Sequence, residues 1–171
     1  MRPILAILPL LASVAACVDI PQASRQQSVR NSSSATFSSP APAARQCIAE
    51  LGATQANFTP LPDQYFASGC SNLNTVRLAS LRSDTSVLSL TNLGPVTCPM
   101  ATNFAGWARY GVDRAARQIL GSRLIRIETF GSYACRNVAG TSRRSGHASA
   151  NAIDVSAFVL ADGRKISVLQ G

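Results

Sequence analysis

The pattern of apolar and polar residues predicts several short strands in the second half of the chain. Residues 75–82 and 86–91 have the length and composition of two strands. Residues 123–130 alternate between apolar and charged positions, which is the periodicity of a strand with one buried face. Residues 151–160 form another apolar run. The pair Asp-Gly that follows it is a hairpin signal, so residues 165–169 are expected to return as its partner.

Between these strands, the sequence predicts one main helix that starts near Pro99 and ends near Gly121. Proline favours the first turn of a helix, and glycine suits the position after the last turn. Apolar residues recur between them at helical spacing; they are Met100, Phe104, Trp107, Ala108, Ala115 and Ile119. We therefore expect an α+β domain with a small, largely antiparallel sheet and one main helix.

The start of the chain has the pattern of an export signal. Met1 and Arg2 form a short cationic start, and residues 3–16 are almost wholly apolar. That run is shorter than the ~20 residues that span a bilayer, but it suits a secretory signal peptide. The sequence Val-Ala-Ala-Cys that ends at Cys17 resembles the lipobox of bacterial lipoproteins. This resemblance implies that Cys17 is the lipid attachment site; ordinary cleavage with an unmodified Cys17 is the alternative.

The chain is expected to have three parts. Residues 1–16 are the predicted lipoprotein signal peptide. Residues 17–45 are rich in Ser, Gln, Ala and Pro, too poor in bulky apolar residues to fold, and are expected to form a disordered tether. Residues 46–171 are the predicted folded domain. Val18, rather than Asp, follows Cys17, which resembles the sorting pattern of lipoproteins in the outer membrane that face the periplasm.

Composition adds information about partners. Hydrophobic residues make up 46% of the chain, enough for a core, and Lys+Arg number 16 against 8 for Asp+Glu, a formal net charge of +8. A basic exported protein is attracted to anionic envelope polymers or lipid head groups, although a solvated basic surface without a dedicated partner has the same composition. Export and the lack of a clustered basic and aromatic stripe argue against nucleic acid.

The cysteines predict disulfide bonds. Four remain besides Cys17: Cys47, Cys70, Cys98 and Cys135. An even number in an oxidising compartment indicates two disulfides, and three connectivities are possible. We prefer the pairs Cys47–Cys70 and Cys98–Cys135. A structural zinc site of four cysteines is the rival interpretation, but these spacings contain no Cys-x-x-Cys pair.

His147 and Asp154 are the residues that point to chemistry. His147 is the only histidine in the chain, and Asp154 follows it within an apolar segment. A carboxylate in such a segment needs a hydrogen bond, an ion pair or a metal, because burying it alone is costly. Imidazole nitrogen and carboxylate oxygen are both zinc ligands. A loop histidine beside an aspartate that caps nearby backbone is the simpler alternative.

Two resemblances bear on this choice. Ser145-x-His147 with Asp154 resembles the first zinc motif of the D-Ala-D-Ala peptidase and hedgehog-like zinc fold. The stretch from about Cys47 to Gly171 is more closely similar to a bacterial family, the extensin-like C-terminal domain. The shared segments are Cys98-Pro99, residues 131–136 (Gly-Ser-Tyr-Ala-Cys-Arg), His147-Ala148, residues 151–154 (Asn-Ala-Ile-Asp) and residues 161–164 (Ala-Asp-Gly-Arg).

The resemblance implies a role for each residue of the site. His147 and Asp154 would be zinc ligands. Arg136 would stabilise negative charge in the transition state, although it lies two residues further along its loop than in the related peptidases; a surface arginine or a salt bridge at the sheet edge is the alternative. Ser145 would orient a ligand or contact substrate, or only cap its loop. The implied activity is zinc-assisted hydrolysis of peptidoglycan peptides.

A catalytic zinc site needs three protein ligands, and the sequence offers only two with motif context. The resemblance implies that the third ligand and the base lie in a His-x-His segment after residue 171, so we expect the chain to be truncated and inactive in this form. Two other functions remain open. The chain could be a non-catalytic peptidoglycan-binding lipoprotein, or a structural envelope lipoprotein.

Overall fold

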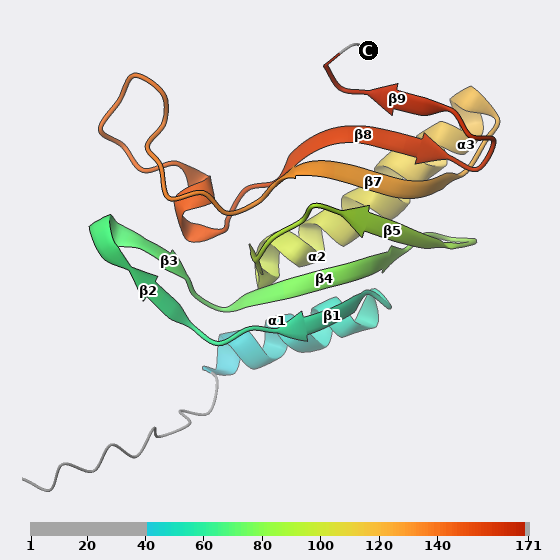
Figure 1. The fold of residues 1–171 in the computed structure, drawn as a ribbon. Coiled ribbons are helices and arrows are strands. Elements are labelled where there is room, and N and C mark those ends of the chain that lie inside the picture. The colour runs from blue at the N-terminus through green and yellow to red at the C-terminus, as the bar shows by residue number, and fades with distance from the viewer. Residues whose placement is uncertain (1–40, 170–171) are drawn as a thin grey trace, which may run out of the picture. The chain divides into compact units, whose positions relative to one another are not determined.

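The structure, a computed structural model, describes residues 41–169, and there the helices cover one face of a large sheet (Figure 1). The strands of this sheet are β1 (Asn57–Pro60), β4 (Thr75–Arg82), β5 (Val87–Thr91), β6 (Val96–Thr97), β7 (Leu124–Gly131), β8 (Asp154–Leu160) and β9 (Lys165–Ser167). They lie in the order β1-β4-β5-β7-β8-β9, and β6 also pairs with β4. Only the pair β5–β7 is parallel, so the prediction of an α+β fold with a largely antiparallel sheet is confirmed.

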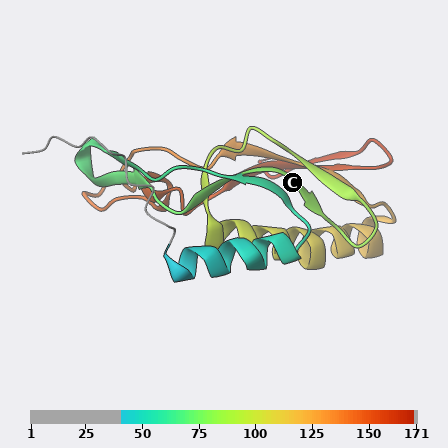
Figure 2. The same cartoon turned by 90° about the horizontal axis from the view of Figure 1, so that it is seen from below.

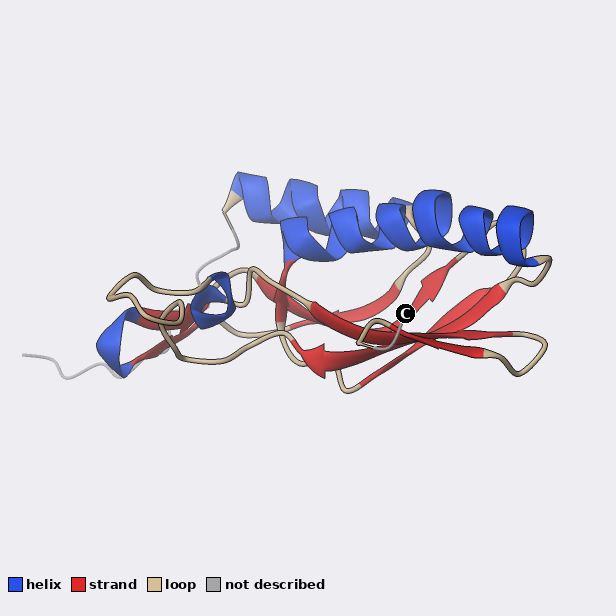
Figure 3. Ribbon diagram, turned by 90° about the horizontal axis from the view of Figure 1, so that it is seen from above, coloured by secondary structure: helices blue, strands red, loops and turns tan. Residues whose placement is uncertain are grey.

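The main helix provides the crossover that a parallel pair of strands requires. It runs without a break through α2 (Cys98–Gly106), the π-helical segment η2 (Trp107–Asp113) and α3 (Arg114–Leu120), and it spans 23 residues. Pro99 lies in its first turn, and Gly121 ends it in the left-handed conformation at φ 69°. The sequence predicted both ends. Helix α1 (Pro42–Ala53) packs beside α2 on the same face of the sheet (Figures 2 and 3).

The core lies between this helical layer and the sheet. Strand β4 contributes the buried side chains of Val76, Leu78 and Leu81, and both α1 and α2 contribute apolar side chains. The largest apolar side chains that are fully buried are Leu51, Val76, Leu81, Leu88, Val96, Leu124, Ile127 and Leu160. Burial of this kind contributes about 1.5–3 kcal/mol for each large side chain and accounts for the cohesion of the layers.

A second, smaller group of elements lies beyond one end of the helices (Figure 3). Strands β2 (Gln64–Phe66) and β3 (Cys70–Asn72) form a separate hairpin, joined by the short helical turn η1 (Ala67–Gly69). The segment after β7 passes through the turn η3 (Gly146–Ser149) before it enters β8. Strand β3 contacts η3, so the hairpin supports the turn that carries His147.

The predicted leader and most of the predicted tether lie outside the described residues, and so does Cys17. Helix α1 begins at Pro42, four residues before the predicted start of the domain at residue 46. None of the helices within residues 41–169 has the length and apolar character needed to cross a membrane.

Candidate metal centre

The turn η3 places His147 between the ends of β7 and β8. Ser145 precedes the turn, and its Oγ accepts the backbone N–H of His147 at 3.4 Å. Gly146 fits closely, because a Cβ atom there would lie 3.2 Å from the carbonyl oxygen of Asn151. Ala150 ends the turn in the left-handed conformation, with φ 54°. The side chain of His147 is thereby held against the domain, and the residue is only 8% exposed.

The two imidazole nitrogens of His147 have different partners. Nδ1 lies 2.7 Å from the carbonyl oxygen of Ser132, and Nε2 lies 3.2 Å from Oδ2 of Asp154. A carbonyl oxygen only accepts, so Nδ1 carries the proton and donates. In neutral His147, Nε2 therefore presents a lone pair toward the carboxylate of Asp154.

A cation between the two side chains would make this contact attractive. A lone pair and an ionised carboxylate repel each other, and a proton on Nε2 or a metal ion between them removes that repulsion. The side chain of Asp154 is 54% exposed, so it is not the buried carboxylate that the apolar segment suggested, and one side of the pair is open to solvent. Two donors of one tetrahedral zinc ion, with bonds of about 2.0–2.2 Å, lie roughly 3.3 Å apart. The observed 3.2 Å between Nε2 and Oδ2 fits that spacing. The Nδ1–H bond to a backbone carbonyl is also the usual outer contact of a histidine that binds metal through Nε2.

Ser132 is a site residue that the sequence did not predict. Its side chain is buried, and its Oγ donates to the carbonyl oxygen of Pro95 at 2.8 Å. The bond fixes the backbone of residue 132, whose own carbonyl accepts from His147. A backbone carbonyl has no signature in the sequence, so only the pairing of β7 with β8, which sets Gly131 opposite Asp154, could have indicated it.

A third ligand is not among the described residues. Within residues 41–169, no group of three His, Cys, Asp or Glu side chains is placed to hold a metal ion. Glu128, for example, is ion-paired, and the hydrogen bond from Lys165 holds its pKa below the usual range. The structure therefore brings together the two predicted ligands and adds none.

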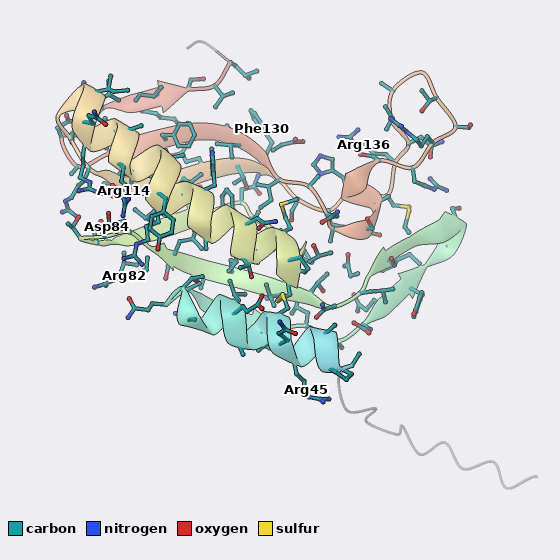
Figure 4. All side chains as sticks on the ribbon, turned by 180° about the vertical axis from the view of Figure 1, so that it is seen from behind. Arg45, Arg82, Asp84, Arg114, Phe130 and Arg136 are labelled. Carbon is teal, nitrogen blue, oxygen red and sulfur yellow. A yellow bond between two sulfur atoms is a disulfide. The ribbon has the colours of Figure 1, made fainter. Side chains whose placement is uncertain are left out.

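Within residues 41–169, the side chains of the remaining predicted site residues, Arg136 and Ser145, make no hydrogen bond to the imidazole of His147 or the carboxylate of Asp154. Arg136 lies at the base of an exposed loop, and its carbonyl oxygen accepts the backbone N–H of Ser145 at 3.1 Å (Figure 4). No hydrogen bond or ion pair within residues 41–169 joins the side chain of Arg136 to His147 or Asp154. The hydroxyl of Ser145 has the capping role that was its alternative interpretation, toward the backbone of His147.

Two disulfides are present, but the preferred connectivity was wrong. The bonds are Cys47–Cys98 and Cys70–Cys135, rather than Cys47–Cys70 and Cys98–Cys135. The first joins α1 to the start of α2, because α1 packs against that helix, an element that the sequence pattern did not predict. The second joins the hairpin of β2 and β3 to the loop that leads to His147.

A groove lies beside Asp154 on the helical side of β8. Its volume is about 840 Å³. The walls are mainly apolar, with the partly exposed rings of Trp107 and Phe130 among them, and the amides of Asn103 and Asn151 add polar groups. An apolar groove with a few polar groups beside a reactive pair is typical of a binding site for small ligands or peptide segments.

The fold and this pair of side chains define an α+β domain with a candidate metal centre at one end of its sheet. The chain belongs to the family described as extensin-like protein C-terminus, whose model matches residues 45–171. No curated protein and no solved structure matches the chain significantly.

Proposed function

We propose that this domain is a zinc-dependent hydrolase of peptidoglycan peptides, in a protein anchored to the bacterial envelope by lipid. One observation carries the proposal: Nε2 of His147 faces Oδ2 of Asp154 at 3.2 Å while Nδ1 is committed to the carbonyl of Ser132. The resemblance to the D-Ala-D-Ala peptidase and hedgehog-like zinc fold supports the same assignment, because its motif places zinc ligands at these two positions.

His147 and Asp154 would hold the zinc ion. A bound zinc ion would supply Lewis-acid chemistry, which polarises a scissile carbonyl and lowers the pKa of water. The residues of the chain would bind the substrate and stabilise the transition state. The groove beside Asp154 would bind and orient the peptide. The guanidinium of Arg136 would donate hydrogen bonds to the oxygen on which negative charge develops, once its loop approaches the substrate. Ser145 would hold the turn that carries His147.

The third ligand and the base are proposed to come from a His-x-His segment that follows residue 171. Two protein ligands compensate poorly for the water molecules that a zinc ion loses on binding. We therefore expect the 171-residue chain to bind zinc weakly and to show no hydrolysis. An extended form that carries the segment should bind one zinc ion and cleave muropeptides.

Metal analysis beside muropeptide digestion, on both lengths of chain, tests this proposal. In the extended form, His147→Ala and Asp154→Ala should abolish both properties. Asp63→Ala, which removes an exposed carboxylate that accepts the backbone N–H of Asn74, is the matched control. Arg136→Ala should retain zinc and lower kcat. Full hydrolysis by the short chain, or unchanged zinc content in His147→Ala, would mean that the site is elsewhere.

A non-catalytic domain that binds peptidoglycan is the second candidate. The presence of only two ligands within residues 41–169 favours it. An extended protein that folds, contains no zinc and still sediments with purified cell walls would support this candidate. A folded protein that does neither would indicate a structural envelope lipoprotein.

The lipid anchor at Cys17 is tested separately, because Cys17 lies outside the described residues. Metabolic labelling with a fatty acid should tag the wild-type chain and leave Cys17→Ser unlabelled. Equal labelling of both forms would contradict the anchor.

A further inference from the structure

Arginines gather at the end of the domain that lies away from His147. Figure 4 shows Arg82, Asp84 and Arg114 at this end and Arg136 at the other. The turn between β4 and β5, the helix from Arg109 onward, and the turn between β8 and β9 meet here. Backbone and side-chain hydrogen bonds connect them. We call this surface the cationic end; its arginines are Arg82, Arg109, Arg114, Arg117, Arg123 and Arg164.

One carboxylate, Asp84, accepts hydrogen bonds from three of these arginines. Its oxygens lie 2.7 Å from Nε of Arg109, 2.9 Å from Nε of Arg114 and 3.1 Å from Nη2 of Arg117. The hydrogen bonds from Arg114 and then Arg109 hold the pKa of Asp84 well below its usual range, so the group is ionised. Three guanidinium groups around one carboxylate leave positive charge and N–H donors that face solvent.

The other carboxylates at this end are already engaged. Asp113 is fully buried and accepts from Arg117 and from the backbone N–H of Leu124. Asp162 is paired with Arg164, whereas Glu50 accepts a hydrogen bond from Gln46, whose neutral amide does not offset a carboxylate charge. Six arginines therefore face four carboxylates, one of which contributes no exposed charge.

Two arginines of the cationic end take no part in these pairs. The side chains of Arg82 and Arg123 are exposed and have no hydrogen bond or ion pair with any residue between 41 and 169. Arg82 lines a small surface hollow of about 180 Å³ with Arg109, Tyr110 and one carboxylate, that of Glu50. The ring of Tyr110 is 55% exposed, with the guanidinium groups of Arg109 and Arg114 at 5.2 and 4.7 Å from its centre.

We propose that the cationic end docks on a membrane surface that carries anionic phospholipid headgroups. Guanidinium groups match phosphate oxygens with paired N–H donors. Three of the arginines surround Asp84, and Arg82, Arg123 and Arg164 come from other segments, so the cationic end offers N–H donors from several places, which fits an array of phosphates. An exposed tyrosine ring among cations is also typical of the interface between membrane and water.

Vesicle sedimentation tests the proposal with the whole 171-residue chain carrying Cys17→Ser, so that no lipid is attached. Binding is measured to phosphatidylcholine vesicles with and without phosphatidylglycerol. The ratio of the two isolates headgroup charge from any contribution of the apolar leader. Arg82→Gln with Arg123→Gln removes the two unpaired cations and leaves the bonds to Asp84 in place. Arg77→Gln with Arg143→Gln, at exposed positions elsewhere, removes the same charge.

The wild-type chain should prefer anionic vesicles, and the preference should weaken with salt. Each arginine near such a surface changes the affinity for anionic vesicles about fivefold. The variant with Arg82→Gln and Arg123→Gln should therefore bind roughly 25-fold more weakly, and the control variant should lose far less affinity. Equal losses of affinity in the two double variants would show that binding depends only on net charge, and this would overturn the proposal. So would equal binding to both vesicles, or displacement by double-stranded DNA at the same phosphate concentration.

Discussion

Ser132 links two parts of the structure that must stay together for His147 to face Asp154. Its Oγ donates to the carbonyl oxygen of Pro95, and its carbonyl accepts from Nδ1 of His147. The approach to Pro95 is close, since a Cβ atom at Gly94 would lie 3.1 Å from that Oγ. The orientation of the imidazole therefore depends on the backbone before α2, far from it in sequence.

At the same scale, the sequence indicated His147 and Asp154 because their side chains carry the chemistry and a motif fixes their spacing. It did not indicate Ser132, which acts through its backbone. It also could not show where the side chain of Arg136 lies, since that depends on how the exposed loop 136–144 folds.

Thr75 provides a prediction about single residues. Its side chain is buried, and Oγ1 has no hydrogen-bond partner within residues 41–169. An unsatisfied buried hydroxyl is unfavourable, so Thr75→Val should raise the free energy of unfolding by about 1 kcal/mol. Thr129→Val is the matched control, because the hydroxyl of Thr129 lies within hydrogen-bond distance of two carbonyl oxygens, those of Thr91 and Asn92, and donates its one hydrogen there. The control should lose about 1–3 kcal/mol.

Urea denaturation of both variants measures the difference. A loss of stability in Thr75→Val as large as that in Thr129→Val would show that the hydroxyl of Thr75 has a partner that stabilises the fold.

Among the elements, long and strongly patterned segments were predicted best. The strand predicted at residues 75–82 is β4, and the one predicted at 123–130 is β7 shifted by one residue. Helix α1 was missed because only Cys47 and Leu51 of its residues are buried, and its first turn shares the Ala and Pro composition of the tether. Strands β1, β2, β3 and β6 have two to four residues each, too few to show a period.

Asp113 holds two elements together, and its removal tests that role. The carboxylate is fully buried; it accepts the backbone N–H of Leu124 at 3.0 Å and Nε of Arg117 at 3.1 Å. Asp113→Ala would leave a buried N–H without a partner where β7 begins, so the free energy of unfolding should fall by about 3 kcal/mol. Asp63→Ala, at an exposed site, should lose less than about 1 kcal/mol. Similar losses in both variants by urea denaturation would contradict this role.

On the scale of the whole domain, the two disulfides stabilise different parts of the fold. Cys47–Cys98 joins the helices of one layer, and Cys70–Cys135 ties the hairpin of β2 and β3 to the loop before His147. The ring contact between Phe66 and Tyr133, at 5.4 Å, supports the second tie. Four cysteines allow three connectivities, and spacing alone does not choose among them because the choice depends on which elements pack together.

The two disulfides should therefore differ in what their removal changes. The sequence separations are 51 and 65 residues, so closing either loop should contribute about 4 kcal/mol through the unfolded state. Cys70→Ser with Cys135→Ser should in addition release the loop at the candidate metal centre. Hydrogen exchange reports this directly, because the backbone N–H of Ala134 donates to the carbonyl oxygen of His147 at 3.1 Å. Protection of that amide should fall in this pair and persist in Cys47→Ser with Cys98→Ser, when both are compared at equal global stability. Equal loss of protection in the two pairs would mean that both bonds act only on the unfolded chain, and that the packing of η3 against β3 holds His147 without the disulfide.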